Sequence, residues 1–391
     1  MTEDKESGQT YKLRKLGESE ESWLLETNEL TQTMLDDTID AGNFTNLSIW
    51  GDKRRKQCKL DNIDFTRLLT NKNFQGLVIY DMSGTIDLTP LVNLSALSVD
   101  WRRDEGEPPF VMFPESEKLE GVLLSGQVDH DRITLAKLPR LRRLGYLDLI
   151  ETDLSWLNKS RSLKSIHVHL TSRYPPSVVL PSIRSLQKLW LICDTKQKSM
   201  RRIDLAPLAS SRHLKDLRIG AHRIKEIDLT PLENCRKIKV IRLGGNSLKS
   251  VDLSPLKSMN LEVLELAGNL LTQLDLVSVS SPSLKALKLG GNRFTSIDLQ
   301  ALSVCTYLEK LYLDRNPLET VDFSPMAGLS HLDYIYLRKQ SLKEIDVTPL
   351  LSCSSLRMID AGRVKLVGNS QKKDDIVSPY LLRMKNRIEW Y

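Results

Sequence analysis

Seven aspartates recur at a nearly constant interval in the C-terminal half of the chain. The interval is 23 or 24 residues, and the set is Asp204, Asp228, Asp252, Asp275, Asp298, Asp322 and Asp346. Carboxylates stacked at this spacing could bind Ca²⁺, which takes oxygen ligands. The interval also equals the period of the surrounding sequence, which favours a structural role in which each carboxylate accepts hydrogen bonds from nearby backbone groups. We predict the structural role.

Two histidines and two glycine-rich runs suggest other sites. His167 and His169 lie two residues apart in a predicted strand, so their side chains share one face and could begin a metal site. No carboxylate, cysteine or third histidine occupies a matching place in the neighbouring repeats. The Gly-Gly-Asn runs at 244–246 and 290–292 lack the Lys-Ser/Thr of a phosphate-binding loop. Because a nucleophile elbow and a recurring Ser, His and Asp set are also missing from the sequence, we predict no metal, no cofactor and no enzymatic activity.

These positions belong to a longer frame, apolar-x-x-apolar-x-apolar-x-x-Asn-x-apolar. Four near-perfect copies span 238–248, 261–271, 284–294 and 308–318. The apolar-x-apolar core has period 2, which predicts a short strand with alternate residues buried. An Asn amide carries both a donor and an acceptor, so it can satisfy buried backbone groups where the chain leaves the strand. The predicted structural ladder is Asn246, Asn269, Asn292 and Asn316.

The frame resembles the leucine-rich repeat over roughly residues 44–364, most firmly over 203–350. The resemblance implies an α/β solenoid, a horseshoe with a parallel β-sheet on the concave face and short helices or turns on the convex face. Later in each copy, Ser or Thr followed by Pro predicts a helix start, with the hydroxyl as cap and Pro at the first position. The copies at 277–278 and 300–301 lack Pro, so less regular turns are expected there. The motif is similar to that of short cytosolic leucine-rich repeat proteins, including archaeal ones.

The 391 residues divide by composition and by the regularity of the repeats. We predict a disordered acidic leader over 1–18, an N-terminal cap helix over 19–43, degenerate repeats over 44–202, regular repeats over 203–364 and a C-terminal cap over 365–391. About fourteen strand cores follow one another from 47–49 to the strand centred on residue 360. Residues 19–40 could alternatively form an amphipathic docking helix. Residues 1–43 hold 4 basic and 11 acidic residues. The rest of the chain holds 52 basic and 39 acidic residues and is therefore a basic body.

Cysteine usage and the lack of apolar runs bear on the compartment. The chain has five cysteines, an odd number without metal-ligand spacing. Cys235, Cys305 and Cys353 occupy the same place in their repeats, which predicts buried, reduced thiols. The sequence shows neither a signal peptide nor a run long enough to span a membrane. We therefore expect a cytoplasmic protein without membrane association.

The side chains projecting from the predicted sheet include the types enriched at interface hot spots, Tyr, Trp and Arg. The candidate partner-binding residues are Trp101, His167, Trp190, Arg218, Arg242, Lys310, Tyr312, Tyr334, Tyr336 and Arg338. The alternative is that aromatic residues stand there because of β-propensity alone and that the charged ones are merely solvated.

The function predicted from these features is that of a non-enzymatic scaffold that binds a protein partner through the concave face. The family resemblance implies a signalling or regulatory enzyme, such as a phosphatase or small GTPase, as a frequent kind of partner. The alternative is a nucleic-acid-binding scaffold that uses the basic body. A bare solenoid is expected to be monomeric, although an exposed tyrosine-rich face could pair with itself.

Overall fold

A computed structural model gives the fold in two compact units, Met1–Tyr174 and Pro175–Tyr391. The residues that the structure describes are 2–3, 10–15, 22–27, 30–51, 63–80, 82, 84–100, 110–112, 114–128, 138–149, 153–170, 178–193, 200–220, 223–257 and 259–391. The boundary between the units precedes residue 203, where the repeats become regular. The change in sequence regularity is therefore not the point at which the packing divides.

The N-terminal unit is built on consecutive parallel strands. Strands β4, β5, β7, β9, β10 and β11 each pair with the main strand of the preceding repeat, and equivalent apolar residues such as Leu77 and Leu97 lie side by side. Strands β6 and β8 pair with each other in a second ladder. Its elements are β1 (Thr2–Glu3), β2 (Thr10–Lys15), β3 (Ser22–Thr27), α1 (Gln32–Asp40), β4 (Asn46–Gly51), the 3-10 helix η1 (Phe65–Thr70), β5 (Gly76–Tyr80), β6 (Thr85–Asp87), β7 (Ala96–Asp100), β8 (Phe110–Met112), β9 (Gly121–Val128), β10 (Arg143–Leu149), η4 (Ser155–Lys159) and β11 (Ser165–Leu170).

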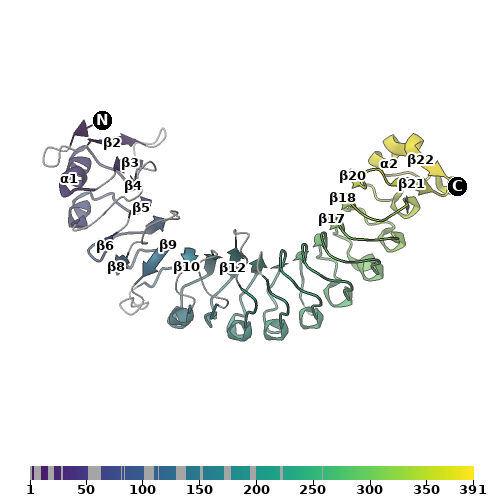
Figure 1. The fold of residues 1–391 in the computed structure, drawn as a ribbon, viewed down its shortest axis with the longest axis horizontal. Coiled ribbons are helices and arrows are strands. Elements are labelled where there is room, and N and C mark those ends of the chain that lie inside the picture. The colour runs from purple at the N-terminus through teal and green to yellow at the C-terminus, as the bar shows by residue number, and fades with distance from the viewer. Residues whose placement is uncertain are drawn as a thin grey trace. The chain divides into compact units, whose positions relative to one another are not determined.

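The C-terminal unit repeats one strand and one 3-10 turn. Leu217, Ile241, Leu264, Leu287, Leu311, Ile335 and Ile359 stand in one register from β13 to β20. The strands line the inner side of this unit and the 3-10 turns its outer side (Figure 1). Its elements are β12 (Lys188–Cys193), η5 (Ala206–Ser210), β13 (Asp216–Gly220), η6 (Thr230–Leu232), β14 (Val240–Arg242), η7 (Ser254–Leu256), β15 (Val263–Glu265), η8 (Val277–Val279), β16 (Ala286–Lys288), η9 (Gln300–Val304), β17 (Lys310–Tyr312), η10 (Ser324–Met326), β18 (Tyr334–Tyr336), β19 (Glu344–Asp346), η11 (Thr348–Leu350), β20 (Met358–Asp360), β21 (Lys365–Gly368), η12 (Ser370–Lys372), α2 (Pro379–Met384), η13 (Lys385–Arg387) and β22 (Ile388–Trp390).

The N-terminal segment differs from the prediction of one helix over 19–43. Of the leader predicted to be disordered, residues 2–3 and 10–15 form strands, and the rest of 1–18 lies outside the described residues. Residues 22–27 form β3, which pairs in parallel with β4 and in antiparallel fashion with β2. Trp23, Leu24 and Leu25 are all buried, as consecutive residues of a strand covered on both faces are. The helix begins only after Thr31, whose hydroxyl accepts a hydrogen bond from Met34 N. The described parallel strands thus begin one repeat earlier than the sequence predicted.

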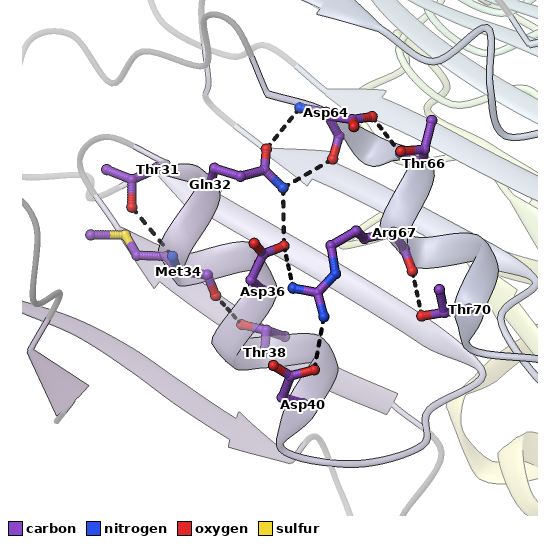
Figure 2. A network of polar contacts seen from close by, with 10 residues as sticks. All are labelled: Thr31, Gln32, Met34, Asp36, Thr38, Asp40, Asp64, Thr66, Arg67 and Thr70. Atoms are coloured by element: carbon purple, nitrogen blue, oxygen red, sulfur yellow. Dashed lines mark hydrogen bonds and ion pairs between the residues drawn. The ribbon is translucent and has the colours of Figure 1, made fainter.

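Helix α1 is held against η1 by polar contacts across its exposed side (Figure 2). Arg67 on η1 bridges Asp36 and Asp40 on α1 at 2.9 and 3.0 Å. One turn away, the Gln32 amide accepts a hydrogen bond from Asp64 N and donates one to Asp64 O. These contacts fix the first helix of the chain on the repeat that follows it.

The aspartate ladder has the structural role that the sequence predicted. The Oδ1 atom of every member accepts a hydrogen bond from the backbone N–H two residues on, as Asp228 does from Thr230 at 2.9 Å. The prediction that the Ser or Thr hydroxyl caps these turns is wrong. The carboxylate caps them, and the Ser254 hydroxyl instead donates to Asp252.

The two repeats without Pro show why this difference matters. Residues 277–279 and 300–304 form 3-10 turns like those of the other repeats. Asp275 and Asp298 cap them with hydrogen bonds of 2.9 and 2.8 Å. The preceding Asp rather than Pro thus starts both turns. The expected irregularity is absent from η9 but present in η8, where Ser280 N donates back to the Leu276 carbonyl instead of to a carbonyl inside the turn.

The last described strand of the main sheet, β20, is covered by the C-terminal segment. Ser378 caps α2 with its hydroxyl, and Pro379 occupies the first turn as the sequence predicted. Leu381 is fully buried, and the Tyr380 hydroxyl donates to the carbonyl of Ile359 on β20. Strands β19, β21 and β22 form a separate three-stranded sheet beside it.

Candidate protein-binding surface

The asparagine ladder fixes the backbone from which the candidate surface projects. Asn269 donates from Nδ2 to the carbonyls of Leu243 and Leu266 at 3.0 and 2.9 Å, and its Oδ1 accepts from Leu248 N at 3.1 Å. Asn246, Asn292 and Asn316 likewise donate to one carbonyl in their own repeat and one in the preceding repeat. Each amide therefore ties two repeats together inside the core.

Three tyrosines gather on the inner face of β17 and β18; we call Tyr312, Tyr334 and Tyr336 the tyrosine cluster. Tyr312 and Tyr336 are partners in the strand register, and their rings stack with centroids 4.4 Å apart and planes 6° apart. Tyr334 and Tyr336 are 6.1 Å apart at 17°. The intervening Ile335 is fully buried, whereas the tyrosines are half-buried. Strand alternation thus places the rings outside the core.

Cationic side chains surround the tyrosine cluster. Lys288 Nζ lies 5.4 Å from the Tyr312 ring centroid, and Lys310 Nζ lies 5.8 Å from that of Tyr334. The Arg357 guanidinium lies 5.1 Å from the Tyr334 ring and pairs with Asp333 through both of its forked nitrogens. Such contacts attract a cation to the ring electrons. They hold the tyrosine rings in place.

The electrostatics of the cluster favour the protonated phenol of Tyr336. The pKa of Tyr336 is raised, first by burial and then by the neighbouring Tyr312, because a phenolate would be poorly solvated beside another ring. Arg338 pairs with Asp360 on the next strand. Tyr336 is therefore a neutral hydrogen-bonding group with cationic side chains nearby.

A second aromatic site lies at the start of the C-terminal unit. The Arg218 guanidinium stacks on Trp190 at 3.8 Å and donates to Asp216 from Nε and a terminal nitrogen at 2.9 and 2.8 Å. Arg242 and Lys288 both pair with Glu265, at 3.2 and 3.3 Å. The positive charges of Arg218, Arg242 and Lys288, which belong to the basic body of the sequence, are thus each paired with an acidic neighbour.

A family model of the leucine-rich repeat matches residues 259–318. These residues thus match the leucine-rich repeat family, and the chain has the leucine-rich repeat fold. None of the curated proteins compared with it matches significantly.

Solved structures of leucine-rich repeat proteins share the fold. A leucine-rich repeat protein of Leptospira interrogans aligns over 93% of both chains with 18% identity and a TM-score of 0.59. Toll of Drosophila, solved in complex with Spatzle, covers 98% of this chain and 54% of its own at 14% identity and a TM-score of 0.61. The plant receptor RGFR1, solved with the peptide RGF2, aligns over 94% of this chain and 68% of its own at 15% identity and a TM-score of 0.51.

The predicted site residues of this leucine-rich repeat protein do not form one site. Lys310, the tyrosine cluster and Arg338 lie together, whereas Trp190, Arg218 and Arg242 are several strands away. His167 belongs to the N-terminal unit, where its Nε2 lies 3.0 Å from Ser165 Oγ. Trp101 lies outside the described residues.

Sequence reasoning missed Arg357 and a ring pair in the N-terminal unit. Trp50 and Tyr80 lie 5.2 Å apart at 33°. Each ring comes directly after the buried apolar core of its strand, and the two strands pair in register. This shared position in the repeat could have predicted the contact from the sequence.

Within the described part of the chain, no group of His, Cys, Asp and Glu is arranged to hold a metal ion. The helices described there are all too short or too polar to cross a bilayer.

Proposed function

We propose that this leucine-rich repeat protein is a non-enzymatic scaffold that binds a protein partner through the inner face of its C-terminal unit. The observation that carries the proposal is the tyrosine cluster, three rings ordered by stacking and by cations yet held outside the core. Preordered aromatic side chains lose little conformational entropy on binding. Large aromatic and Arg side chains also carry much of the binding energy of protein interfaces.

The solved relatives give the proposal general support. Toll was solved with Spatzle and RGFR1 with RGF2, so this fold presents surfaces to polypeptide ligands in other proteins. Curved solenoids offer extended surfaces that suit such ligands. Nucleic-acid binding through the basic body is less well supported, because Arg218, Lys239 and Arg242 are each paired with a carboxylate.

We further propose that the protein acts as a monomer in the cytoplasm. Cys235, Cys305 and Cys353 are buried and free, which suits a reducing compartment. Light scattering on the purified chain should then give the monomer mass of 44.6 kDa.

The central test is capture from an extract of the source organism with matched tyrosine variants. Tyr336→Ala removes the middle ring of the cluster. Tyr307→Ala removes an exposed ring from the turn after η9, where it lies tilted against His331. Loss of an aromatic hot spot costs about 2 kcal/mol or more, or roughly thirtyfold in affinity. Tyr336→Ala should abolish capture of a discrete protein. It should lower Tm by only a few degrees, which corresponds to a loss of about 1 kcal/mol in the free energy of unfolding.

The control decides the interpretation. Tyr307→Ala should capture the partner as the unmodified chain does. Equal loss of capture in both variants, or capture that persists in Tyr336→Ala, would show that the tyrosine cluster does not bind the partner.

A further inference from the structure

The backbone leaves each strand from β14 to β18 through one residue in the left-handed conformation. After β14, β15 and β16 this residue is a glycine, Gly245, Gly268 or Gly291, with φ between 68° and 71°. Gly362, one position earlier relative to its own strand β20, is also left-handed at φ 66°. The equivalent residues of the β17 and β18 repeats are Arg315, at φ 56°, and Lys339, at φ 61°. A residue with a Cβ is strained in this region, whereas Gly is not. The two tyrosine-bearing repeats therefore carry backbone strain that their neighbours avoid.

The two strained residues lie at one edge of the tyrosine cluster. Arg315 N donates to the carbonyl of Arg338 at 2.7 Å, so the chain turns of the two repeats are in contact. The side chains of Arg315 and Arg338 are 68% and 66% exposed. Residues with strained backbone cluster at functional sites. We call Arg315, Arg338 and Lys339 the cationic edge.

The local charge balance is positive. Residues 310–315, 333–339 and 357–363 hold six basic and three acidic side chains. The acidic ones are already paired: Asp333 with Arg357, Asp360 with Arg338, and Asp314 with Arg315 at 3.6 Å. Among the described residues, Lys310, Lys339 and Arg363 have no such carboxylate partner. Cations in excess of their internal partners are complementary to an acidic ligand.

We propose that the cationic edge and the tyrosine cluster together bind an acidic, carboxylate-rich segment of the protein partner. This inference rests on the proposed function and names the chemistry of its ligand. Arg side chains bind carboxylates through their forked N–H groups, and the neutral phenols add hydrogen-bond donors.

The same residues are less suited to nucleic-acid bases. Tyr312 has Tyr336 on one side and Lys288 near its ring, and Tyr334 has Lys310 and Arg357 near its ring. Base stacking needs a free ring face. Because these faces are already in use, the ring edges and hydroxyls are the parts left for a ligand, and these suit carboxylates.

The test combines binding with stability in one double variant, Arg315→Gly with Lys339→Gly. Glycine relieves the strain at both positions, so Tm should rise, while the loss of two cations should weaken binding of an acidic peptide about tenfold. The probe is a fluorescein-labelled peptide of alternating Glu and Phe, and its matched probe has Gln in place of every Glu. Fluorescence anisotropy measures the binding of both peptides to the full chain at about 0.15 M salt.

Two control variants accompany it. Arg236→Ala with Lys237→Ala removes two exposed cations from an outer turn of the same unit and should change neither Tm nor binding appreciably. Gly362→Ala should lower Tm, because the site has open space for a Cβ and only the left-handed backbone opposes it. An unchanged Tm in Gly362→Ala would refute the strain on which the inference rests.

The outcomes separate the inference from the proposed function. Preference for the Glu peptide that is lost in the double variant supports an acidic ligand. Equal binding of both peptides, unchanged binding by the double variant, or tighter binding of a uridine oligonucleotide would overturn it. In those cases, capture of a partner that is lost in Tyr336→Ala would still support the proposed function. Conversely, capture that persists in Tyr336→Ala would count against the proposed function without changing the peptide measurement.

Discussion

Replacement of Asn292 by Ala tests the structural logic of the ladder at its centre. Its Nδ2 donates to the carbonyls of Leu266 and Leu289 at 3.0 and 2.9 Å, and its Oδ1 accepts from Leu271 N at 3.1 Å. The side chain is only 6% exposed, so water cannot readily replace it. A buried N–H left without a partner costs about 1–3 kcal/mol, and each further lost hydrogen bond about 1 kcal/mol. We expect destabilisation of about 3–5 kcal/mol.

Guanidinium unfolding followed by circular dichroism measures the loss, and hydrogen exchange locates it. Leu271 N–H and its neighbours should exchange faster in Asn292→Ala, because nearest-neighbour coupling concentrates the effect in adjacent repeats. Asn260→Ala, at an exposed position between β14 and β15, is the matched control and should change stability by less than about 0.5 kcal/mol. A similar small loss for Asn292→Ala, with exchange at Leu271 unchanged, would refute the role assigned to the ladder.

Two further predictions concern titratable groups. The pKa of Asp228 is lowered by hydrogen bonds from Thr230, so its stabilising effect is complete above the ordinary carboxyl pKa and is lost as the pH falls through the lowered value. Asp228→Asn should therefore make Tm fall less between about pH 5 and pH 2 than it does in the unmodified chain. An unchanged fall of Tm over this range would show that the Asp228 carboxylate does not contribute to acid unfolding. Burial raises the pKa of Cys353 to about 11, so iodoacetamide at about pH 8 should leave this thiol intact in the native protein and modify it after unfolding. Rapid modification of Cys353 in the native protein, seen by peptide mass spectrometry, would show that burial does not protect this thiol.

The repeat period was enough to predict the strands and both ladders. A leucine-rich repeat cannot bury its apolar face alone, so each residue type recurs wherever its structural task recurs. Asn269 and Asp228 illustrate this, since their neighbours along the ladder make equivalent hydrogen bonds. The ends of the solenoid were harder to predict. Residues 22–27 form a strand through pairing with both β2 and β4, which no local pattern shows.

The sequence by itself determined the fold class, the register of the strands and the tasks of Asn and Asp, because these are local tasks repeated at one period. Only the tertiary structure decided which charges remain available. Arg218 and Arg242 look as basic as Lys310 and Lys339 in the sequence, yet carboxylates on their own or the next strand neutralise the first two. It also showed that Arg315 and Lys339 occupy a left-handed backbone position where the three preceding repeats have glycine. Pairing across repeats and backbone angle are properties of the folded chain, because they depend on which strands become neighbours.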